Sequence, residues 1–495
     1  MEEQSSYRQI FKATGLFGGV QVFNILIGII RSKFIAVLLG PAGMGITGLL
    51  TSTTSMITGL TNFGLGSSAV RNVAEAHAQQ NKQKIGIVVA TLRRLVWFTG
   101  LLGTFVTLIF APWLSELTFG NKDYTYPFMF LSVTLLFAQL SAGQNVLLQG
   151  TRNLKYLAKA SLSGSVLGLL VTVPLYYFFG INGIVPALVI ASVITLILSW
   201  YFSRKIRIDR IRLSIKEIRR EGKGMLVMGF MLSLSGLITL AVSYLTRIYI
   251  ANEGDVEQVG LYNAGFVIIG TYVGLVFTSM GTDYYPRLSG VAYDDLLAKK
   301  MINQQAEIAI LILSPILMVF FVYIHWIVQL LYSNKFTPIN VMIQWAALGM
   351  FFRAVGWAIA FLYLAKGVSR LFFVNELIAN IYFLGLNIVG YKYLGLGGLG
   401  MAFMAGYVIY LLQVFIICNR KYKFNFDKAF VKIFVFQLLC AVCCFCAVKF
   451  ISSPYQYIAG SILIILSSSY SFIELNKRLN LKNIVVSKVK NRNGK

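Results

Sequence analysis

The chain has 495 residues, of which 57% are hydrophobic and 13% are charged, and its mean hydropathy is +0.72. A water-soluble domain cannot bury so much apolar surface, so the composition excludes an ordinary soluble protein and indicates one that lies in lipid. The net charge of +26 raises the question of a nucleic-acid partner, which the position of the basic residues answers below.

Apolar segments long enough to cross a bilayer recur along the whole chain. A helix needs about 20 apolar residues to span the ~30 Å hydrocarbon core. The first segment is too long for a signal-peptide core and should stay in the membrane. We predict an all-α polytopic membrane protein with about fourteen transmembrane helices, at residues 11–39, 45–70, 95–118, 125–149, 156–179, 182–203, 225–251, 258–284, 302–331, 338–365, 371–391, 397–418, 429–450 and 454–474.

Most lysine and arginine residues lie in loops that this topology places on one side of the membrane. The outer loops and outer helix ends hold only Lys122, Lys335, Lys392 and Lys449. The positive-inside rule makes the basic side cytoplasmic, and both termini lie on it. Topology and contact with anionic lipid explain the charge, so no nucleic-acid partner is expected.

Two halves of the chain carry similar motifs at an offset of about 215 residues. "YYFFGINGIVPALVI" (176–190) matches "YKYLGLGGLGMAFMA" (391–405), and Gly45 in "GMGITGL" corresponds to Gly260 in "QVGLYNA". Each half holds six spans, so the halves are parallel repeats, as in transporters that rock around a midplane site. We predict two six-helix bundles and an appended helix pair: an N-lobe at 1–203, a basic cytoplasmic linker at 204–224, a C-lobe at 225–418, and helices 13 and 14 with a basic cytoplasmic tail at 419–495.

Polar residues follow one face of the first span. Gln21, Asn24, Gly28 and Arg31 succeed one another at spacings of three and four, which share a helix face, whereas Lys33 lies on the opposite side. An arginine at mid-bilayer costs from roughly 3 to well over 10 kcal/mol, so its presence there points to a function. The alternative is that the basic side chains reach a headgroup.

Further spans carry hydroxyl faces and basic residues. The hydroxyls could bond their own backbone or a neighbouring helix, but a guanidinium group needs water or an anion. The sequence therefore predicts a cationic aqueous cavity between the two lobes. Its proposed anion contacts are Arg31, Arg353, Arg247 and Lys33, and its proposed polar lining is Gln21, Asn24, Thr54, Thr58, Ser235 and Thr239.

Acidic residues within the spans are few. Asp283, Glu307 and Glu376 lie in the cytoplasmic third of their helices and are candidates for binding a coupling cation. The alternative is that they pair with Arg287 or with a lysine at the cavity mouth. Because basic groups dominate, the cavity should select an anion, and the arginine fork suits phosphate oxygens.

Cysteine and histidine residues give no sign of a metal or a catalytic centre. All five cysteines follow residue 417, and no histidine lies in the helix that contains "CAVCCFC". Of the two histidines, His77 lies in a cytoplasmic segment, and His325 has no predicted nucleophile or acid beside it. The sequence also lacks the glycine-rich ATP-binding motif. We expect no enzyme, no metal and no cofactor, with an ion gradient or the membrane potential as the energy source.

Three motifs resemble a known family. "KFIAVLLGPAGMGITGLLTS" (33–52), "LLQGTRNLKYLAKASL" (147–162) and "FFGINGIVPALVI" (178–190) are similar to the Wzx-type polysaccharide flippases of the MOP superfamily, in the branch of the O-antigen and enterobacterial common antigen translocases. The similarity covers residues 8–418. Twelve spans are usual in that branch, whereas fourteen are predicted here, as in the lipid II flippase of the same superfamily.

This resemblance implies a function in surface polysaccharide biosynthesis, such as that of O-antigen lipopolysaccharide. The protein would move an undecaprenyl-pyrophosphate-linked oligosaccharide across the bacterial inner membrane, alternating between inward-open and outward-open states, with the polysaccharide polymerase machinery as a partner. Two alternatives remain open at this point. One is a MATE-like multidrug or cation antiporter, which usually needs buried acids, and the other is a membrane polysaccharide polymerase or acyltransferase, which needs a general base.

Overall fold

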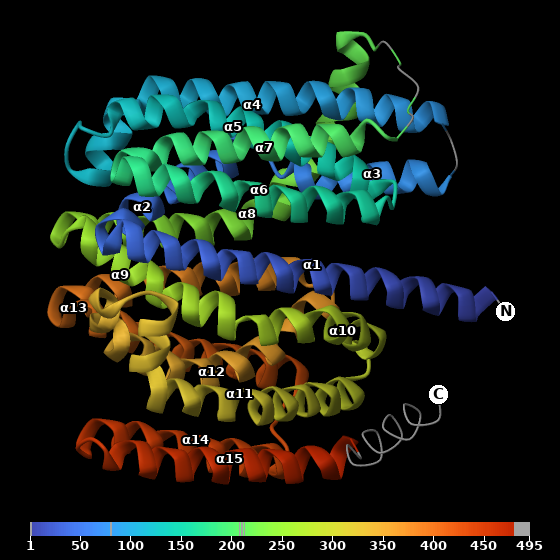
Figure 1. The fold of residues 1–495 in the computed structure, drawn as a ribbon. Coiled ribbons are helices and arrows are strands. Elements are labelled where there is room, and N and C mark those ends of the chain that lie inside the picture. The colour runs from blue at the N-terminus through green and yellow to red at the C-terminus, as the bar shows by residue number, and fades with distance from the viewer. Residues whose placement is uncertain (1, 80–81, 207, 209–210, 212, 480–495) are drawn as a thin grey trace, which may run out of the picture. The chain divides into compact units, whose positions relative to one another are not determined.

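The computed structural model of the chain consists almost wholly of helices (Figure 1), and it describes residues 2–79, 82–206, 208, 211 and 213–479. Within these ranges no strand is present, which confirms the predicted all-α class. The helices are α1 (Glu2–Leu38), α2 (Gly40–Thr61), α3 (Leu65–Ala78), α4 (Lys82–Phe119), α5 (Thr125–Gly150), α6 (Leu154–Phe179), α7 (Ile184–Ser203), α8 (Ile215–Glu253), α9 (Val256–Val267), α10 (Leu275–Val291), α11 (Asp295–Leu331), α12 (Asn340–Ala365), α13 (Ser369–Tyr422), α14 (Lys428–Phe450) and α15 (Tyr455–Leu479).

Short segments of other helical types connect some of these helices. The 3-10 turns η1 (Gly180–Gly183) and η3 (Asn334–Ile339) precede α7 and α12, and the π-helical η2 (Ile268–Val273) joins α9 to α10. The predicted spans fall largely on helices, but the span predicted at 45–70 is not a single helix. The helix α2 ends at Thr61, and residues 62–64 form a turn before α3 begins at Leu65. The part of the chain that the structure describes contains nine helical segments that are long and apolar enough to cross a membrane. Two of them, Leu154–Ser203 with 50 residues and Ser369–Tyr422 with 54, each cover two predicted spans. The total of fourteen crossings stays a prediction.

The chain divides into two compact units. Unit 1 comprises Met1–Gly260 with Leu331–Ser333, and unit 2 comprises Leu261–Leu330 with Asn334–Lys495. In unit 1, α5 packs against α4 and α7, α6 packs against α7 and α1, and α8 packs against α2, α3 and α4 (Figure 1). In unit 2 the strongly buried α12 packs against α13, and α14 packs against α15. The predicted lobe boundaries at 203 and 225 stay a prediction.

The repeated glycines adopt matching backbone conformations in the two halves. Gly180 has φ 55° and ψ −133°, and Gly395 has φ 57° and ψ −141°. Such angles are strained for a residue with a side chain, so both positions require glycine where the chain reverses between two spans. The conformations agree with the predicted alignment of these two motifs.

A second pair of glycines permits a close helix contact inside unit 1. A Cβ atom on Gly45 would collide with the carbonyl oxygen of Val256, and one on Gly260 would collide with that of Pro41. The residues in these two contacts are related by the same offset of 215, so each contact is the repeat-related copy of the other. The motifs "GMGITGL" and "QVGLYNA" therefore fit together because neither glycine has a side chain.

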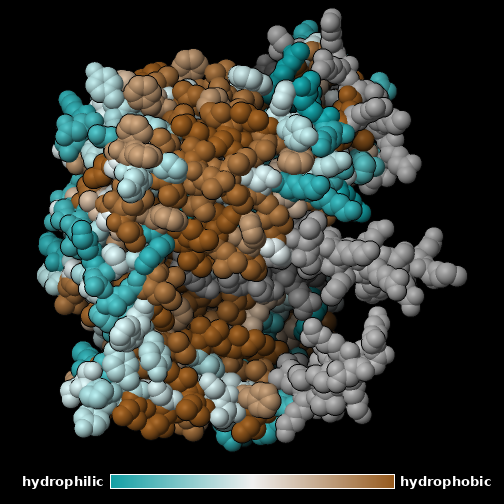
Figure 2. Space-filling view, in the orientation of Figure 1, coloured by the Kyte–Doolittle hydropathy of each residue, from teal (hydrophilic) through white to brown (hydrophobic). Residues whose placement is uncertain are grey.

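Apolar side chains in unit 1 form a buried cluster between the helices. Further apolar side chains lie on its outer surface. A cluster of buried residues joins α3, α4, α5 and α8, and it includes Leu65, Leu92, Val146 and Met225. Figure 2 shows apolar side chains over the middle of α4, α5 and α7, with hydrophilic residues gathered towards the helix ends. This distribution is that of helices whose middle parts lie in hydrocarbon and whose ends lie in water.

Candidate functional site

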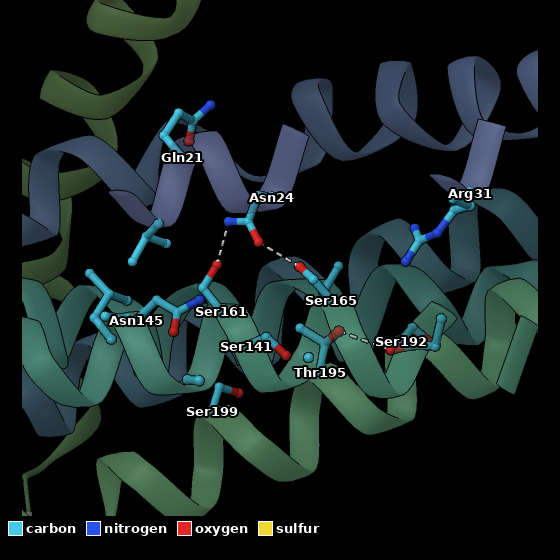
Figure 3. A pocket seen from close by; sticks show the side chains of 18 residues that line it. Gln21, Asn24, Arg31, Ser141, Asn145, Ser161, Ser165, Ser192, Thr195 and Ser199 are labelled. Carbon is cyan, nitrogen blue, oxygen red and sulfur yellow. Dashed lines mark hydrogen bonds between the residues drawn. The ribbon is translucent and has the colours of Figure 1, made fainter. Parts of the chain in front are cut away.

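A cavity of about 580 Å³ lies inside unit 1, between α1, α5, α6 and α7 (Figure 3). Its walls consist mostly of small or polar side chains, which leave the space that larger residues would fill. The lining residues on α1 are Val20, Gln21, Asn24 and Arg31, those on α5 are Ala138, Ser141 and Asn145, those on α6 run from Leu157 to Gly168, and those on α7 are Ala191, Ser192, Thr195 and Ser199.

Asn24 connects α1 to α6 across this cavity. Its side-chain nitrogen donates to Ser161 Oγ over 2.9 Å, and Ser165 Oγ donates to its side-chain oxygen over 2.7 Å (Figure 3). Ser161 and Ser165 are one helical turn apart, so a single amide contacts both. The two hydrogen bonds hold this part of α1 in place beside the stripe of small residues on α6.

Arg31 extends from α1 towards the middle of α6 (Figure 3). A Cβ atom on Gly168 would lie 3.2 Å from Arg31 Nη2, so the absence of a side chain at Gly168 makes room for the guanidinium group. Arg31 Nε is buried and has no hydrogen-bond partner within the described protein. Gly168 is near the centre of the 26-residue α6, so the Arg31 guanidinium lies beside the middle of that helix.

Two further polar atoms of this cavity are buried without a protein partner. They are Ser141 Oγ and Asn145 Oδ1, both on α5. A buried polar group that makes no hydrogen bond costs about 1–3 kcal/mol, so water or a ligand is expected to contact these atoms. The unsatisfied groups on α1 and α5 therefore indicate a hydrated cavity rather than a dry helix interface.

The electrostatics of the cavity favour an anion. Among the described residues that line it, Arg31 is the only charged one, and none is acidic. A single positive charge in a cleft with low-dielectric walls attracts anions more strongly than the same charge in water. The planar guanidinium can donate two parallel hydrogen bonds to a phosphate or carboxylate. The surrounding hydroxyl and amide groups can bind a hydroxylated ligand.

Lys33 has a different environment, as its position on the helix predicts. Its Nζ donates to the backbone oxygen of Tyr332 over 2.5 Å, and it does not line the cavity. The helix α1 continues without a break through both residues, so Arg31 and Lys33 point to different sides. Gln21, Asn24 and Arg31 thus face helices of their own unit, whereas the sequence placed their cavity between the lobes. The predicted cavity between the lobes stays a prediction.

The hydroxyl residues predicted on α2 make hydrogen bonds within their own helix. Thr54 Oγ1 donates to the carbonyl oxygen of Leu50 over 3.0 Å, and Thr58 Oγ1 donates to that of Thr54 over 2.7 Å. Neither threonine lines the cavity around Arg31. In each bond the threonine hydroxyl donates its hydrogen, and the lone pairs of the hydroxyl oxygen stay available. Water can therefore still donate a hydrogen bond to either hydroxyl oxygen.

The predicted residues on α8 also lie apart from this cavity. The Arg247 guanidinium donates to the carbonyl oxygen of Ser243 over 2.8 Å and also to its hydroxyl. Thr239 is exposed on the same helix, and the side chain of Ser235 is outside the described residues. The contact to Ser243 shows Arg247 bound to its own helix.

Arg353 lies in unit 2, among aromatic rings. Its Cζ is 5.2 Å from the ring centroid of Phe277 and 5.5 Å from that of Tyr407. The third neighbour is Met350, whose Sδ is 3.8 Å from Arg353 Nη1. Arg31 and Arg353 therefore belong to different units and have different surroundings.

The acidic candidates differ from one another. Glu307 is buried and forms an ion pair with Arg478 of α15, with 2.7 Å between Oε2 and Nε, instead of with Arg287 or a lysine. Glu376 accepts a hydrogen bond from Tyr410 Oη over 2.7 Å, and no salt bridge to it is found among the described residues. The side chain of Asp283 is outside the described residues. Of the three, Glu376 has the surroundings that best suit a cation or a proton.

Sequence reasoning did not identify the residues of α5, α6 and α7 that complete the cavity. The available signal was the run "SLSGSVLG", in which Ser161, Gly164, Ser165 and Gly168 share one face of α6. Between membrane helices, such a small-residue stripe usually permits close helix packing. Only the structure shows that the stripe lines an open space.

Residues 34–341 match the family described as "Polysaccharide biosynthesis protein", and this region is more than half of the chain. The chain belongs to this family. The "Lipid III flippase" of Escherichia coli (strain K12) is 24% identical over 409 residues, which are 80% of this chain and 95% of the relative. The protein named "Putative O-antigen transporter" from Shigella flexneri is 23% identical over 341 residues, which are 67% of this chain and 78% of the relative.

Two solved structures share the fold of this member of the polysaccharide biosynthesis family. "Lipid II flippase MurJ, inward closed conformation" has a TM-score of 0.72 at 14% identity, over 94% of this chain and 99% of that chain. An inward-facing MATE family multidrug resistance transporter of the MOP superfamily has a TM-score of 0.70 at 16% identity, over 83% of this chain and 96% of that chain. The predicted resemblance to polysaccharide flippases is confirmed by the family match and by the names of the Escherichia coli and Shigella flexneri relatives.

Proposed function

We propose that the protein is a flippase that moves an undecaprenyl-pyrophosphate-linked oligosaccharide across the bacterial inner membrane by alternating access. The oligosaccharide would be the repeat unit of an O-antigen or a related surface polysaccharide. The names of two relatives, "Lipid III flippase" and "Putative O-antigen transporter", support a lipid-linked glycan as the substrate class.

The observation that carries this proposal is the chemistry of the cavity around Arg31. One guanidinium group beside the middle of α6 has a buried Nε without a partner in the described protein, and the rest of the described lining offers hydroxyl and amide groups but no carboxylate. A pyrophosphate needs a cation that can donate parallel hydrogen bonds, and sugar hydroxyls need partners that both donate and accept. One cavity offers both.

The physical task of such a flippase explains why these groups lie inside a membrane protein. A pyrophosphate and its sugars cannot cross ~30 Å of hydrocarbon unaided, because their charges and hydroxyls would lose their hydration. A hydrated, positively charged cavity replaces that hydration while the polyprenyl tail stays in lipid. The absence of acidic side chains from the described lining makes the cavity poorly suited to a cationic drug.

We further propose that an ion gradient or the membrane potential, and no cofactor, drives the cycle. Glu376 is the best candidate for the coupling residue, since Glu307 is held by Arg478. The positive-inside rule places both termini in the cytoplasm. A surface polysaccharide polymerase is the partner that would take over the exported unit.

Substitution of Arg31 by alanine tests the proposal. In a strain that lacks its own flippase and is complemented by this chain, we expect Arg31→Ala to reduce surface polysaccharide by roughly ten- to a hundredfold, the effect of about 1.5–3 kcal/mol for a lost charge-assisted hydrogen bond. Lipid-linked oligosaccharide should accumulate at the same time. The matched control is Arg94→Ala, which removes an exposed arginine that does not line the cavity.

A binding measurement separates phosphate recognition from a general defect. Purified wild-type protein should bind undecaprenyl pyrophosphate more tightly than undecaprenol, and Arg31→Ala should remove most of this difference. Full export by Arg31→Ala, at protein levels equal to those of the wild type, would contradict the proposed role of the cavity.

A further inference from the structure

A second recess lies on the outer surface of unit 1, over the basic ends of α4, α5 and α7. It has a volume of about 560 Å³ and is lined mainly by apolar residues of the three helices, with α5 between the other two. Its polar residues are Arg93, Gln144, Ser203 and Arg204. We call this recess the arginine–tryptophan groove, after Arg93, Trp97, Trp200 and Arg204.

The four residues that give the groove its name are arranged in two matched pairs. Arg93 precedes Trp97 by four residues on α4, and Trp200 precedes Arg204 by four residues on α7. Since α5 and α6 intervene, α4 and α7 run in opposite directions. Both arginines therefore lie at the same end of the groove, and both tryptophans lie about one turn, or roughly 5 Å, deeper.

This order of side chains matches the depth profile of a phospholipid in a leaflet. Tryptophan is enriched where headgroups meet hydrocarbon, and Trp97 and Trp200 are 51% and 48% exposed at that level. The Arg204 guanidinium lies over the Trp200 ring, with 4.4 Å between Cζ and the ring centroid, which orients it. Deeper in the groove the lining includes Leu140 and Ile197, which suit an acyl chain.

The charge of the groove requires an anionic occupant. Both arginines are exposed, and neither has an acidic partner among the residues that the structure describes. No carboxylate is among the described residues that line the groove. Two guanidinium groups at a membrane surface attract the anionic lipids of that leaflet.

The groove differs from the cavity around Arg31 in a way that identifies its occupant. The cavity has hydroxyl or amide groups on all four of its helices, whereas the groove adds only Gln144 and Ser203 to its arginines. The two spaces meet at one hydrogen bond, in which Ser199 Oγ of the cavity donates to Gln144 Oε1 of the groove over 2.5 Å. The groove therefore offers a glycan fewer groups that both donate and accept hydrogen bonds than the cavity does. Its two arginines and its apolar floor suit a small phosphate headgroup with two acyl chains.

We propose that the arginine–tryptophan groove binds an anionic phospholipid, with Arg93 and Arg204 contacting its phosphate and its acyl chains lying over the apolar floor. The positive-inside rule assigns this end of unit 1 to the cytoplasmic leaflet. The bound lipid lies against α5 and α7, which form two walls of the Arg31 cavity. Its occupancy therefore stabilises the wall that contains the Gln144–Ser199 hydrogen bond.

Lipid retention by purified full-length protein tests this proposal. Protein would be exchanged into detergent micelles that contain phosphatidylglycerol or phosphatidylcholine, and retained lipid would be counted by native mass spectrometry. We expect Arg93→Gln combined with Arg204→Gln to lower phosphatidylglycerol retention by about tenfold or more and to leave phosphatidylcholine retention unchanged. The same pair of substitutions should lower the melting temperature gained on adding phosphatidylglycerol.

The chain offers a charge-matched control. Arg94→Gln combined with Lys205→Gln removes two exposed cations next to the same two positions, but neither residue lines the groove. This control should retain phosphatidylglycerol within twofold of wild type. Equal losses of phosphatidylglycerol retention in both double variants would show that retention depends only on the general surface charge, and they would overturn the proposal.

Two further outcomes keep the test decisive. If undecaprenyl pyrophosphate displaces phosphatidylglycerol at an equal molar ratio and its own retention depends on Arg93 and Arg204, the groove is a substrate site and the proposal is wrong. If the glutamine double variant does not give a monodisperse protein, Trp97→Leu combined with Trp200→Leu replaces it. That pair should also lower phosphatidylglycerol retention, and unchanged retention would contradict the proposal.

Discussion

Arg31 and Arg353 both lie within predicted membrane spans, but the structure gives them opposite surroundings. Arg31 faces hydroxyl and amide groups across a cavity, and its Nε has no partner in the described protein. Arg353 lies between the rings of Phe277 and Tyr407. Cation–π contacts contribute about 0.5–2 kcal/mol each, depending on how far they are desolvated, so the rings offset part of the cost of placing the Arg353 charge there.

The comparison shows that the depth of a charge does not by itself identify a ligand contact. Both side chains avoid hydrocarbon, but only Arg31 is surrounded by groups that would themselves bind a hydrated, hydroxylated ligand. We therefore expect substitutions around Arg31 to affect transport first, and substitutions of Arg353 to affect stability first.

Among substitutions of residues next to Arg31, Gly168→Val is expected to reduce export the most. A Cβ atom there would lie 3.2 Å from Arg31 Nη2, and the two methyl groups of valine would displace the guanidinium from the cavity. Export should fall about as far as in Arg31→Ala, by roughly ten- to a hundredfold. Surface polysaccharide in the complemented strain is the measurement. The control is Gly385→Val, at an exposed glycine of α13 with no atom near its Cβ position. Similar losses of export in both variants would mean that valine disturbs the helix itself rather than displacing Arg31.

A smaller loss is expected from Arg31→Lys. Lysine keeps the positive charge but lacks the planar fork that binds two phosphate oxygens at once, so export should fall about tenfold, the effect of roughly 1.4 kcal/mol. Initial rates of lipid-linked oligosaccharide transport in vesicles would measure this loss. Wild-type rates for the lysine variant would show that charge alone suffices.

The substitution Arg353→Leu tests the expectation that Arg353 affects stability more than transport. Loss of the contacts to Phe277 and Tyr407 should destabilise the protein by about 1–2 kcal/mol, seen as a lower melting temperature in detergent. Transport per folded molecule should fall less than in Arg31→Ala. The comparison would fail if Arg353→Leu kept the wild-type melting temperature and lost all transport, because Arg353 would then act as a ligand contact.

The smallest effect on transport is expected from single cysteines that report hydration. In a variant without the five native cysteines, Ser192→Cys in the cavity should react with a membrane-impermeant thiol reagent, because water fills that space. Thr54→Cys on α2 should react more slowly, since Thr54 does not line this cavity. Faster reaction at Thr54 than at Ser192 would place the main aqueous surface on α2.

Much of the fold and part of the site were predictable from local patterns. The apolar segments predicted where helices lie, and the glycine motifs predicted the matching reversals at Gly180 and Gly395. The spacing of Gln21, Asn24 and Arg31 predicted that they face one space. Lys33, which was also proposed as an anion contact of the cavity, does not line it. These features depend on residues that are close in sequence, and helix geometry alone relates them.

The sequence by itself determined the membrane class, the internal repeat and a polar stripe that contains a buried arginine. Only the tertiary structure decided what that stripe faces. Ser141 and Asn145, the serines around Gly164, and Ser192 come from three other helices, and no local pattern relates their faces to α1. Likewise, the ion pair of Glu307 with Arg478 joins residues 171 positions apart. In lipid, apolar surface does not select which helices pack together, so small residues and polar contacts decide the pairing.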